Sequence, residues 1–322
     1  MKRFLWAAVY GAILLCFTVY CVLDTFVIAR VYTPEVTEAL TSAASDTDRL
    51  TVAAQTESVT EALTEAGTTE TEPGETEAPV ISENYYSDGN ITISITEYDH
   101  LGSAVYVADV TLSSPEYLKT ALARNAYGRN LTEKTSTIAN RAGAILAING
   151  DYYGAQERGF VIRNGVIYRK TAKKDAEALV IYEDGSFEIV NENETTAEAL
   201  LSAGAYNVFT FGPGLVDDGQ ICVSLYSEVG RAMSSNPRTA IGMIDDLHYI
   251  FVVADGRTDA SEGLSLYELA GFMQSLGAKC AYNLDGGGSS TMVFNGKIIN
   301  KPTTNGRTIS ERSVSDIVCI GY

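Results

Sequence analysis

The sequence predicts an α+β domain, with mostly antiparallel strands and a few interspersed helices, preceded by one transmembrane helix and a disordered stalk. Three observations lead to this class. The chain has 322 residues, 46% of them hydrophobic, which is enough for a sizeable core. Short β-branched runs between turn pairs outnumber segments of helical period. A long apolar run stands near the N-terminus. We therefore divide the chain into an anchor at 1–32, a linker at 33–83 and a domain at 84–322.

The anchor is predicted from Phe4–Leu23, a run of twenty residues without a charge. As a helix rising about 1.5 Å per residue, it spans the roughly 30 Å hydrocarbon core of a bilayer. Lys2 and Arg3 precede it, so we expect a single-pass protein with a cytoplasmic N-terminus and an extracytoplasmic domain. The alternative is a cleavable signal peptide with Val27 and Ala29 at the cleavage site. Both interpretations export the domain.

The linker is rich in threonine and glutamate. Residues 33–80 hold twelve Thr and nine Glu, with no aromatic residue and no lysine. Such a composition buries too little apolar surface to offset the entropy of ordering the chain, so we expect disorder. The string VTEAL at 36–40 recurs at 59–63, which indicates a spacer that grew by duplication.

Strands account for most of the predicted domain. Residues 91–96 alternate apolar and polar side chains, and 104–110 form a β-branched run. Asp184-Gly185 separates two further apolar runs and predicts a hairpin. Similar turn pairs stand at three other places, namely Asn164-Gly165, Asp245-Asp246 and Asn295-Gly296.

Helices are fewer. The clearest is predicted over Leu266–Leu276, because Ser265 and Glu268 form a capping box and Gly277 follows the last turn. Weaker helical patterns cover Pro115–Arg124, Ser136–Ala142 and Thr196–Ser202.

Composition excludes two classes of function. The formal net charge is -18, so the chain lacks the clustered cations that nucleic-acid binding requires. Two histidines without ligand spacing and five cysteines without a CxxC pair exclude a zinc site built from these residues.

The densest group of reactive side chains runs from Asp285 through three glycines to Ser289 and Ser290. Successive glycines let the backbone approach a ligand closely, and their N–H groups form an anion-binding concavity. A plain flexible turn is the alternative. Asp285 favours chemistry, because its carboxylate stands at the end of a strand beside this concavity.

Four other segments place charged side chains at strand ends, where loops carry function. They are NGDYYG at 149–154, NPRTAIG at 236–242, DGR at 255–257 and the stretch 306–312. Taken singly, each also suits a solvated surface turn.

Together these motifs resemble the phosphodiester glycosidase family, which includes the uncovering enzyme and bacterial relatives described in terms of exopolysaccharide biosynthesis. The resemblance covers roughly 140–322. The strings that carry it also include NLDGGGSSTMV at 283–293, NKP at 300–302 and ERSVSD at 311–316. The anchor and the linker lie outside it.

The resemblance implies hydrolysis of a sugar-1-phosphodiester, in which water attacks the anomeric carbon and a phosphate monoester leaves. The substrate would belong to a surface or exported glycopolymer. Asp285 is the expected nucleophile or base, with Asp255 and Asp151 as partner carboxylates. No cofactor is required, although these three aspartates are the residues that would hold Ca²⁺ or Mg²⁺.

A phosphate leaving group makes cations and N–H donors more important than a general acid. We expect phosphate contacts from Arg238, Arg257 and Arg312. The remaining expected binding residues are Gly286, Gly287, Gly288, Ser289, Ser290, Asn149, Asn283 and Thr239.

Three alternatives stay open. A Ser289 or Ser290 nucleophile would need His100 or His248 as its base. A binding module would recognise a phosphate-bearing wall polymer or polysaccharide without catalysis. A metal-dependent phosphodiesterase would break the P–O bond instead of the C–O bond.

Overall fold

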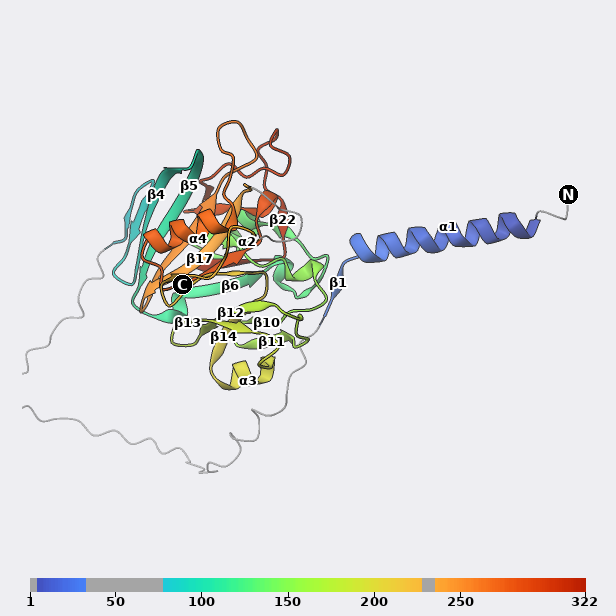
Figure 1. Ribbon diagram of the computed structural model, residues 1–322, viewed down its shortest axis with the longest axis horizontal. Helices are drawn as coiled ribbons and strands as arrows, with labels where there is room; N and C mark the ends of the chain where they lie inside the picture. The colour runs from blue at the N-terminus through green and yellow to red at the C-terminus, as the bar shows by residue number, and fades with distance from the viewer. Residues whose placement is uncertain (1–4, 33–77, 228–234) are drawn as a thin grey trace, which may run out of the picture.

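The computed structural model describes residues 5–32, 78–227 and 235–322 (Figure 1). The predicted linker lies outside the described residues as far as residue 77. Every strand pair within the described ranges is antiparallel, which confirms the predicted sheet type. Three sheets of five or more strands build the domain.

The largest sheet has nine strands in the order β16-β15-β19-β17-β18-β5-β4-β3-β2. Long hairpins join β4 to β5 and β17 to β18, whereas β18 pairs with β5 and β17 with β19 across long stretches of sequence. Its strands are β2 (Val80–Ile81), β3 (Tyr85–Ser87), β4 (Ile91–His100), β5 (Ser103–Leu112), β15 (Gly214–Asp217), β16 (Gln220–Ile221), β17 (Arg238–Asp245), β18 (His248–Ala254) and β19 (Cys280–Leu284).

Two five-stranded sheets lie against it. The second sheet has the order β21-β20-β9-β23-β6, and the third β11-β10-β14-β12-β13. The strands of the second sheet are β6 (Leu118–Leu122), β9 (Leu146–Asn149), β20 (Met292–Phe294), β21 (Lys297–Ile298) and β23 (Asp316–Ile320). Those of the third are β10 (Val161–Arg163), β11 (Val166–Arg169), β12 (Glu177–Tyr182), β13 (Phe187–Asn191) and β14 (Ala205–Phe209).

One apolar core is shared by all three sheets. Alternation along each strand turns one face inward, and the side chains that meet there are buried. This core includes Ile93, Val110, Phe251, Ile148, Phe294, Val318, Leu179 and Phe209. The hairpins predicted at Asn164-Gly165 and Asp184-Gly185 are confirmed as β10–β11 and β12–β13.

Helices cover the outer faces of the sheets. α4 (Leu266–Ser275) packs on the nine-stranded sheet and has the predicted capping box between Ser265 and Glu268. α2 (Thr135–Ala142) packs on the second sheet and α3 (Ala197–Ser202) on the third, as Figure 1 shows.

The helix predicted over Pro115–Arg124 is wrong. A single 3₁₀ turn, Pro115–Tyr117, is followed by strand β6, which pairs along its whole length with β23. Pairing with a partner strand and burial of Leu118 override the weak local helical pattern.

The short elements complete the fold. They are β1 (Arg30–Val31), β7 (Gly128–Arg129), β8 (Glu133–Lys134), β22 (Ser313–Val314) and the 3₁₀ turns Ala123–Asn125, Tyr153–Ala155 and Gly287–Ser289.

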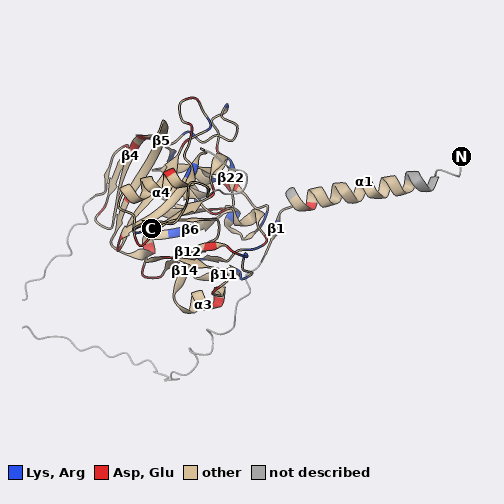
Figure 2. Cartoon of the chain, in the orientation of Figure 1, with Lys and Arg blue, Asp and Glu red and all other residues tan. Residues whose placement is uncertain are grey.

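The apolar run near the N-terminus is helical, forming α1 (Leu5–Phe26). Asp24 is the charged residue in the sequence of α1, and Figure 2 draws most of this helix in tan, the colour of residues other than Lys, Arg, Asp and Glu. Within the described ranges, however, we find no helix with the length and hydropathy needed to span a bilayer. The predicted membrane anchor is therefore not confirmed.

The segment after α1 is attached to the domain. β1 pairs with β7, and the Tyr32 N–H donates to the Tyr127 carbonyl at 2.9 Å. The Asn130 amide donates to the carbonyls of Thr25 and Ile28 at 3.2 and 3.1 Å. The chain is also paired at β2, where Val80–Ile81 joins the nine-stranded sheet before residue 84. The domain therefore holds the chain before and after residues 33–77, and the second of these contacts, β2, falls within the predicted linker at 33–83.

Gly128 makes the β1 contact possible, since a Cβ there would lie 1.9 Å from the Arg30 carbonyl oxygen. We predict that Gly128→Ala releases β1, so that amides of residues 30–32 exchange faster by hydrogen-exchange mass spectrometry. The free energy of unfolding should fall by less than about 1 kcal/mol, because only a two-residue strand is lost. The matched control is Gly271→Ala in α4, where an added Cβ meets nothing within 4 Å. Unchanged exchange in the Gly128 variant would contradict the role of this contact.

Candidate active site

The strand register brings the predicted motifs to one edge of the molecule. Arg238 at the start of β17 pairs with Ala254 at the end of β18, and Thr239 pairs with Leu284 at the end of β19. In the second sheet, Asn149 at the end of β9 pairs with the start of β23. Loops from five strand ends therefore meet at this edge.

Asn149 joins the two sheets at this point. Its buried amide Nδ2 donates to the Asp285 carbonyl at 2.6 Å. Its Oδ1 accepts from the Thr239 hydroxyl at 2.9 Å and from the Thr291 N–H at 3.2 Å. Asn149 and Thr239 are thus supports for the backbone of Asp285, and their side chains lie in the interior.

Asp285 follows β19 and keeps 9% of its side chain exposed. Nη2 of Arg312 lies 3.1 Å from its Oδ2, and Nε of Arg312 donates to the Ser289 hydroxyl at 2.9 Å. Burial raises the pKa of Asp285 above its ordinary value, while the charge of Arg312 and the Ser289 hydrogen bond act in the opposite direction. The carboxylate is therefore buried, oriented and paired, with one edge accessible.

The three glycines allow neighbouring loops to approach. A Cβ at Gly287 would lie 2.9 Å from Nη2 of Arg257, and one at Gly288 would lie 2.2 Å from the Thr304 hydroxyl. Gly287 also has a φ of +62°, in the left-handed region that favours glycine. Close packing against the arginine and threonine side chains is incompatible with the flexible-turn alternative.

Arg257 lies at the exposed rim beside these glycines. Its Nη1 donates to the Thr304 carbonyl at 2.8 Å, and its Nη2 to Oδ1 of Asn236 at 3.1 Å. Desolvation lowers the pKa of Arg257, and the nearby positive charge of Arg312 lowers it further. Its φ of +65° is strained for a residue with a side chain. Two guanidinium groups therefore stand at the accessible edge of Asp285.

Several other predicted binding residues lie inside. Arg238 is 3% exposed, and its Nε donates to the Leu264 carbonyl at 2.8 Å. Asn283 is buried and donates to the Gly212 carbonyl. Ser290 is fully buried. Of the three arginines expected to contact phosphate, Arg257 and Arg312 lie at the rim and Arg238 lies inside, and the phosphate contacts themselves stay a prediction.

Asp255 has a supporting role in this structure. Its carboxylate accepts from Nδ2 of Asn300 at 2.9 Å and from the Lys301 N–H at 3.0 Å. Asn300 in turn donates to the Ser290 carbonyl and accepts from the Met292 N–H. Burial raises the pKa of Asp255. Asp255 therefore holds the segment after β21 against the start of β20.

Asp151 belongs to a buried ion cluster that the sequence did not indicate. Arg163, 1% exposed, lies 2.9 Å from Oδ1 of Asp151 and 2.8 Å from Oδ2 of Asp316. Asp151 also accepts from the N–H groups of Tyr153 and Thr210. Desolvation raises the pKa of Asp316 to about 7, against the opposing charge of Arg163. Two sequence features could have pointed to this cluster: Asp316 ends the ERSVSD string, and Arg163 stands beside the Asn164-Gly165 turn.

Ca²⁺ or Mg²⁺ would need several of the three aspartates to act as ligands. Asp151, Asp255 and Asp285 each contact different protein donors, and the described residues contain no group of three or more His, Cys, Asp or Glu side chains that could hold an ion. Ca²⁺ or Mg²⁺ therefore stays a prediction.

The histidines lie elsewhere. His100 packs against the Phe272 ring, and Nε2 of His248 lies 3.1 Å from Oδ1 of Asp109. Neither is placed as a base for Ser289 or Ser290, which weakens the serine-nucleophile alternative.

The sequence of this chain is similar to one known family and to several known proteins. Residues 142–321 match the family described as phosphodiester glycosidase. An uncharacterized SPβ prophage-derived protein of Bacillus subtilis, YomE, is 29% identical over 251 residues, 72% of this chain and 38% of its own. Mouse N-acetylglucosamine-1-phosphodiester α-N-acetylglucosaminidase is 37% identical over 98 residues, 30% of this chain and 18% of its own. The chain thus spans less than two fifths of the length of these relatives.

Solved structures share the fold. The catalytic domain of zebrafish N-acetylglucosamine-1-phosphodiester α-N-acetylglucosaminidase, auto-inhibited by its pro-peptide, aligns with a TM-score of 0.57 at 22% identity, covering 72% of this chain and 83% of that one. A hypothetical protein from Synechocystis aligns with a TM-score of 0.50 at 18% identity, covering 72% and 62%.

The buried ion cluster leads to a stability prediction. Arg163→Met leaves Asp151 and Asp316 buried without their cation, so the free energy of unfolding should fall by about 3–5 kcal/mol. Arg129→Met is the matched control, because it removes a surface pair with Glu157 that should contribute less than about 1 kcal/mol. Urea denaturation measures both. Equal shifts of the two midpoints would show that the cluster has no special importance.

Proposed function

Because this chain belongs to the phosphodiester glycosidase family, we propose that it hydrolyses sugar-1-phosphodiesters between the anomeric carbon and the phosphate oxygen. One observation carries the proposal. The partly accessible carboxylate of Asp285 stands beside two guanidinium groups, Arg257 and Arg312, at the edge where the loops around the three glycines meet. This arrangement offers a charge of each sign to the two halves of one glycosyl phosphate.

The arginines suit the leaving group. A departing phosphate monoester is already a stable anion, so it needs charge stabilisation more than a proton. Arg312 and Arg257 present cations at the rim, and guanidinium groups bind phosphate oxygens in a bidentate manner. The backbone around Gly286–Gly288 adds N–H donors beside them.

Asp285 suits the sugar. The transition state at the anomeric carbon resembles an oxocarbenium ion, which a carboxylate stabilises as a nucleophile or as the base for water. Asp151 and Asp255 are engaged by donors in the interior, so Asp285 is the carboxylate we assign to the reacting carbon. We assign positioning to the other two: Asp255 holds the segment after β21, and Asp151 holds the turn after β9.

We further propose a substrate within a surface or exported glycopolymer and an extracytoplasmic location. The names of the relatives specify an N-acetylglucosamine-1-phosphodiester, which supports a hexosyl phosphate as the first compound to test. The charge-free run at 4–23 after Lys2 and Arg3 supports export. Digestion by protease added to intact cells tests this location, and full protection would contradict it.

The assay is sugar release by the full-length chain from an N-acetylglucosamine-1-phosphodiester. We predict that Asp285→Asn lowers turnover by at least about a hundredfold, because the carboxylate at the reacting carbon is lost. In ¹⁸O-labelled water the label should enter the sugar. Label in the phosphate would instead indicate a phosphodiesterase, and retention of polymer without release would indicate a binding module. Parallel assays with EDTA decide whether Ca²⁺ or Mg²⁺ is needed.

Arg312 has a separate signature in the pH profile. Activity requires ionised Asp285, whose pKa is raised by burial, so activity falls as the pH drops through that raised value. Arg312 lowers this pKa, so Arg312→Ala should raise KM and also move the acidic limb to higher pH. Arg307→Ala, an exposed arginine of the same loop, is the matched control. If the acidic limb of the Arg312 variant did not move, the claim that Arg312 lowers the pKa of Asp285 would be wrong.

A further inference from the structure

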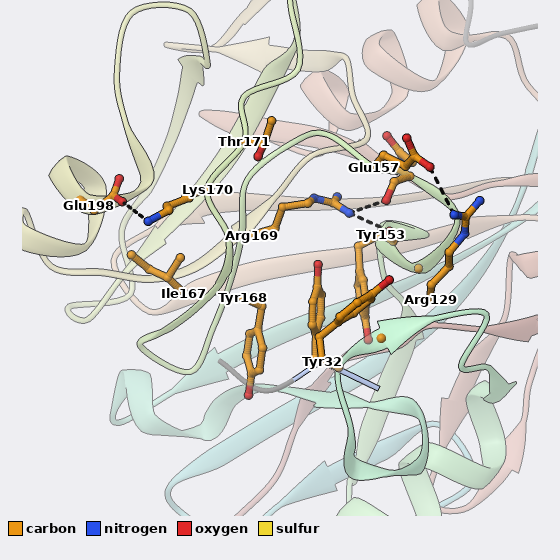
Figure 3. A pocket seen from close by; sticks show the side chains of 14 residues that line it. Tyr32, Arg129, Tyr153, Glu157, Ile167, Tyr168, Arg169, Lys170, Thr171 and Glu198 are labelled. Atoms are coloured by element: carbon orange, nitrogen blue, oxygen red, sulfur yellow. Dashed lines mark hydrogen bonds and ion pairs between the residues drawn. The ribbon is translucent and has the colours of Figure 1, made fainter. Parts of the chain in front are cut away.

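A hollow of about 480 Å³ lies away from the Asp285 site (Figure 3). Its walls come from β7, the turn at 153–157, β11 and the segment after α1. None of its lining residues is Asp285, Arg257 or Arg312. Tyr153 and Gly154, the end of the NGDYYG motif, contribute to it. The part of this motif that the proposed reaction leaves unexplained therefore builds the hollow.

Four tyrosine rings form one side of the hollow. The rings of Tyr127 and Tyr153 are stacked with centroids 5.0 Å apart, and Tyr168 lies 4.9 Å from Tyr127. Tyr32 approaches Tyr127 at 6.0 Å. Tyr127 and Tyr153 are buried, whereas Tyr168 is half-buried and Tyr32 is 45% exposed. Figure 3 shows the rings of Tyr32, Tyr153 and Tyr168 gathered together. The inner pair thus fixes the outer rings, which remain accessible to a ligand.

Polar groups of both signs surround these rings. Arg129 lies 3.3 Å from Glu157, and Lys170 lies 3.6 Å from Glu198. Arg169 is fixed by three backbone carbonyls of residues 153–159, at 2.5 to 3.0 Å. The hollow therefore offers donors and acceptors in near balance. A site for phosphate or another small anion needs cations that carboxylates do not already neutralise. The cations of this hollow instead lie close to carboxylates or backbone carbonyls.

We propose that this hollow binds a neutral saccharide unit. A pyranose ring has an apolar C–H face, which suits an aromatic surface, and a rim of hydroxyls, which suits paired donors and acceptors. The volume accommodates a small number of sugar rings. Tyr32 completes the wall, so docking of β1 helps to form the site. This binding needs no catalysis at Asp285, and it goes beyond the proposed reaction.

For a polymeric substrate, the second site changes the concentration of reacting groups. A chain held by its neutral sugars keeps its glycosyl phosphates at a high effective concentration near the protein. Binding at the hollow would therefore lower KM for the polymer and leave KM for a small phosphodiester unchanged.

The test is calorimetric titration of the full-length chain with chitotetraose and with cellotetraose, in buffer free of sugar-based detergent. We expect saturable binding of at least one, and Tyr168→Ala should weaken it about tenfold, because an accessible ring is lost. Tyr226→Ala is the matched control, since Tyr226 is 91% exposed and lies outside the hollow. Asp285→Asn should bind as tightly as the unaltered chain, and Tyr168→Ala should still release sugar from the small phosphodiester.

Three results would overturn the proposal. The first is the absence of any heat of binding with either oligosaccharide at concentrations up to about 10 mM, which exceeds the dissociation constant of a weak specific site. The second is equal loss of affinity in the Tyr168 and Tyr226 variants. The third is binding of inorganic phosphate, abolished by Arg129→Ala, without binding of either oligosaccharide. Because these titrations do not measure turnover, their failure would leave the proposed reaction standing, and a failure of the reaction would leave saccharide binding standing.

Discussion

The shared guanidinium of Arg163 is the constraint on which the rest of the structure depends. It ends β10 in the third sheet, while its two carboxylate partners, Asp151 and Asp316, follow β9 and begin β23 in the second. Its Nη1 also donates to the carbonyls of Ile162 and Val208. Burying a guanidinium together with two carboxyl groups costs much solvation energy, so such a cluster contributes more to a unique arrangement than to stability. Here it ties the third sheet to the second, alongside the hydrogen bonds of Thr120 in β6 with Asn207 in β14 and with Asn164.

From this cluster a short chain of contacts leads to Asp285, the carboxylate that we propose to react. Asp316 packs against Gly150, where a Cβ would lie 2.2 Å from its Oδ1. Gly150 accepts a hydrogen bond from the Asp285 N–H at 3.1 Å, and Asn149 holds the Asp285 carbonyl. The backbone of Asp285 is thus fixed from the second sheet, although the residue belongs to the first. Preorganisation of this kind places a charged group without reorganisation when the substrate binds.

The sequence predicted those parts of the fold that depend on neighbours along the chain. The Asn164-Gly165 and Asp184-Gly185 hairpins and the capped helix α4 are specified within a few residues, and all three are present. β6 was missed because its partner β23 lies far away in sequence, and the pairing energy is invisible to a local pattern. The chemistry at the strand ends was likewise recognisable, since Asp285, Arg257 and Arg312 do converge. The sequence did not indicate which of the charged residues point inward. Arg238 and Asp151 differ from the rim residues only in their tertiary contacts.

The distribution of charge reconciles an acidic chain with the anionic substrate that we propose. The formal net charge of -18 belongs to the whole chain. Exposed charges farther away than a Debye length, about 8 Å at physiological ionic strength, contribute little at the rim. Close to the rim, the carboxylates of Asp151 and Asp255 are satisfied by interior donors, and Arg312 pairs with Asp285. The field that a phosphate meets is therefore set by Arg257 and Arg312. Net charge describes the whole chain, whereas the strand register and the glycine contacts determine which charges face the substrate.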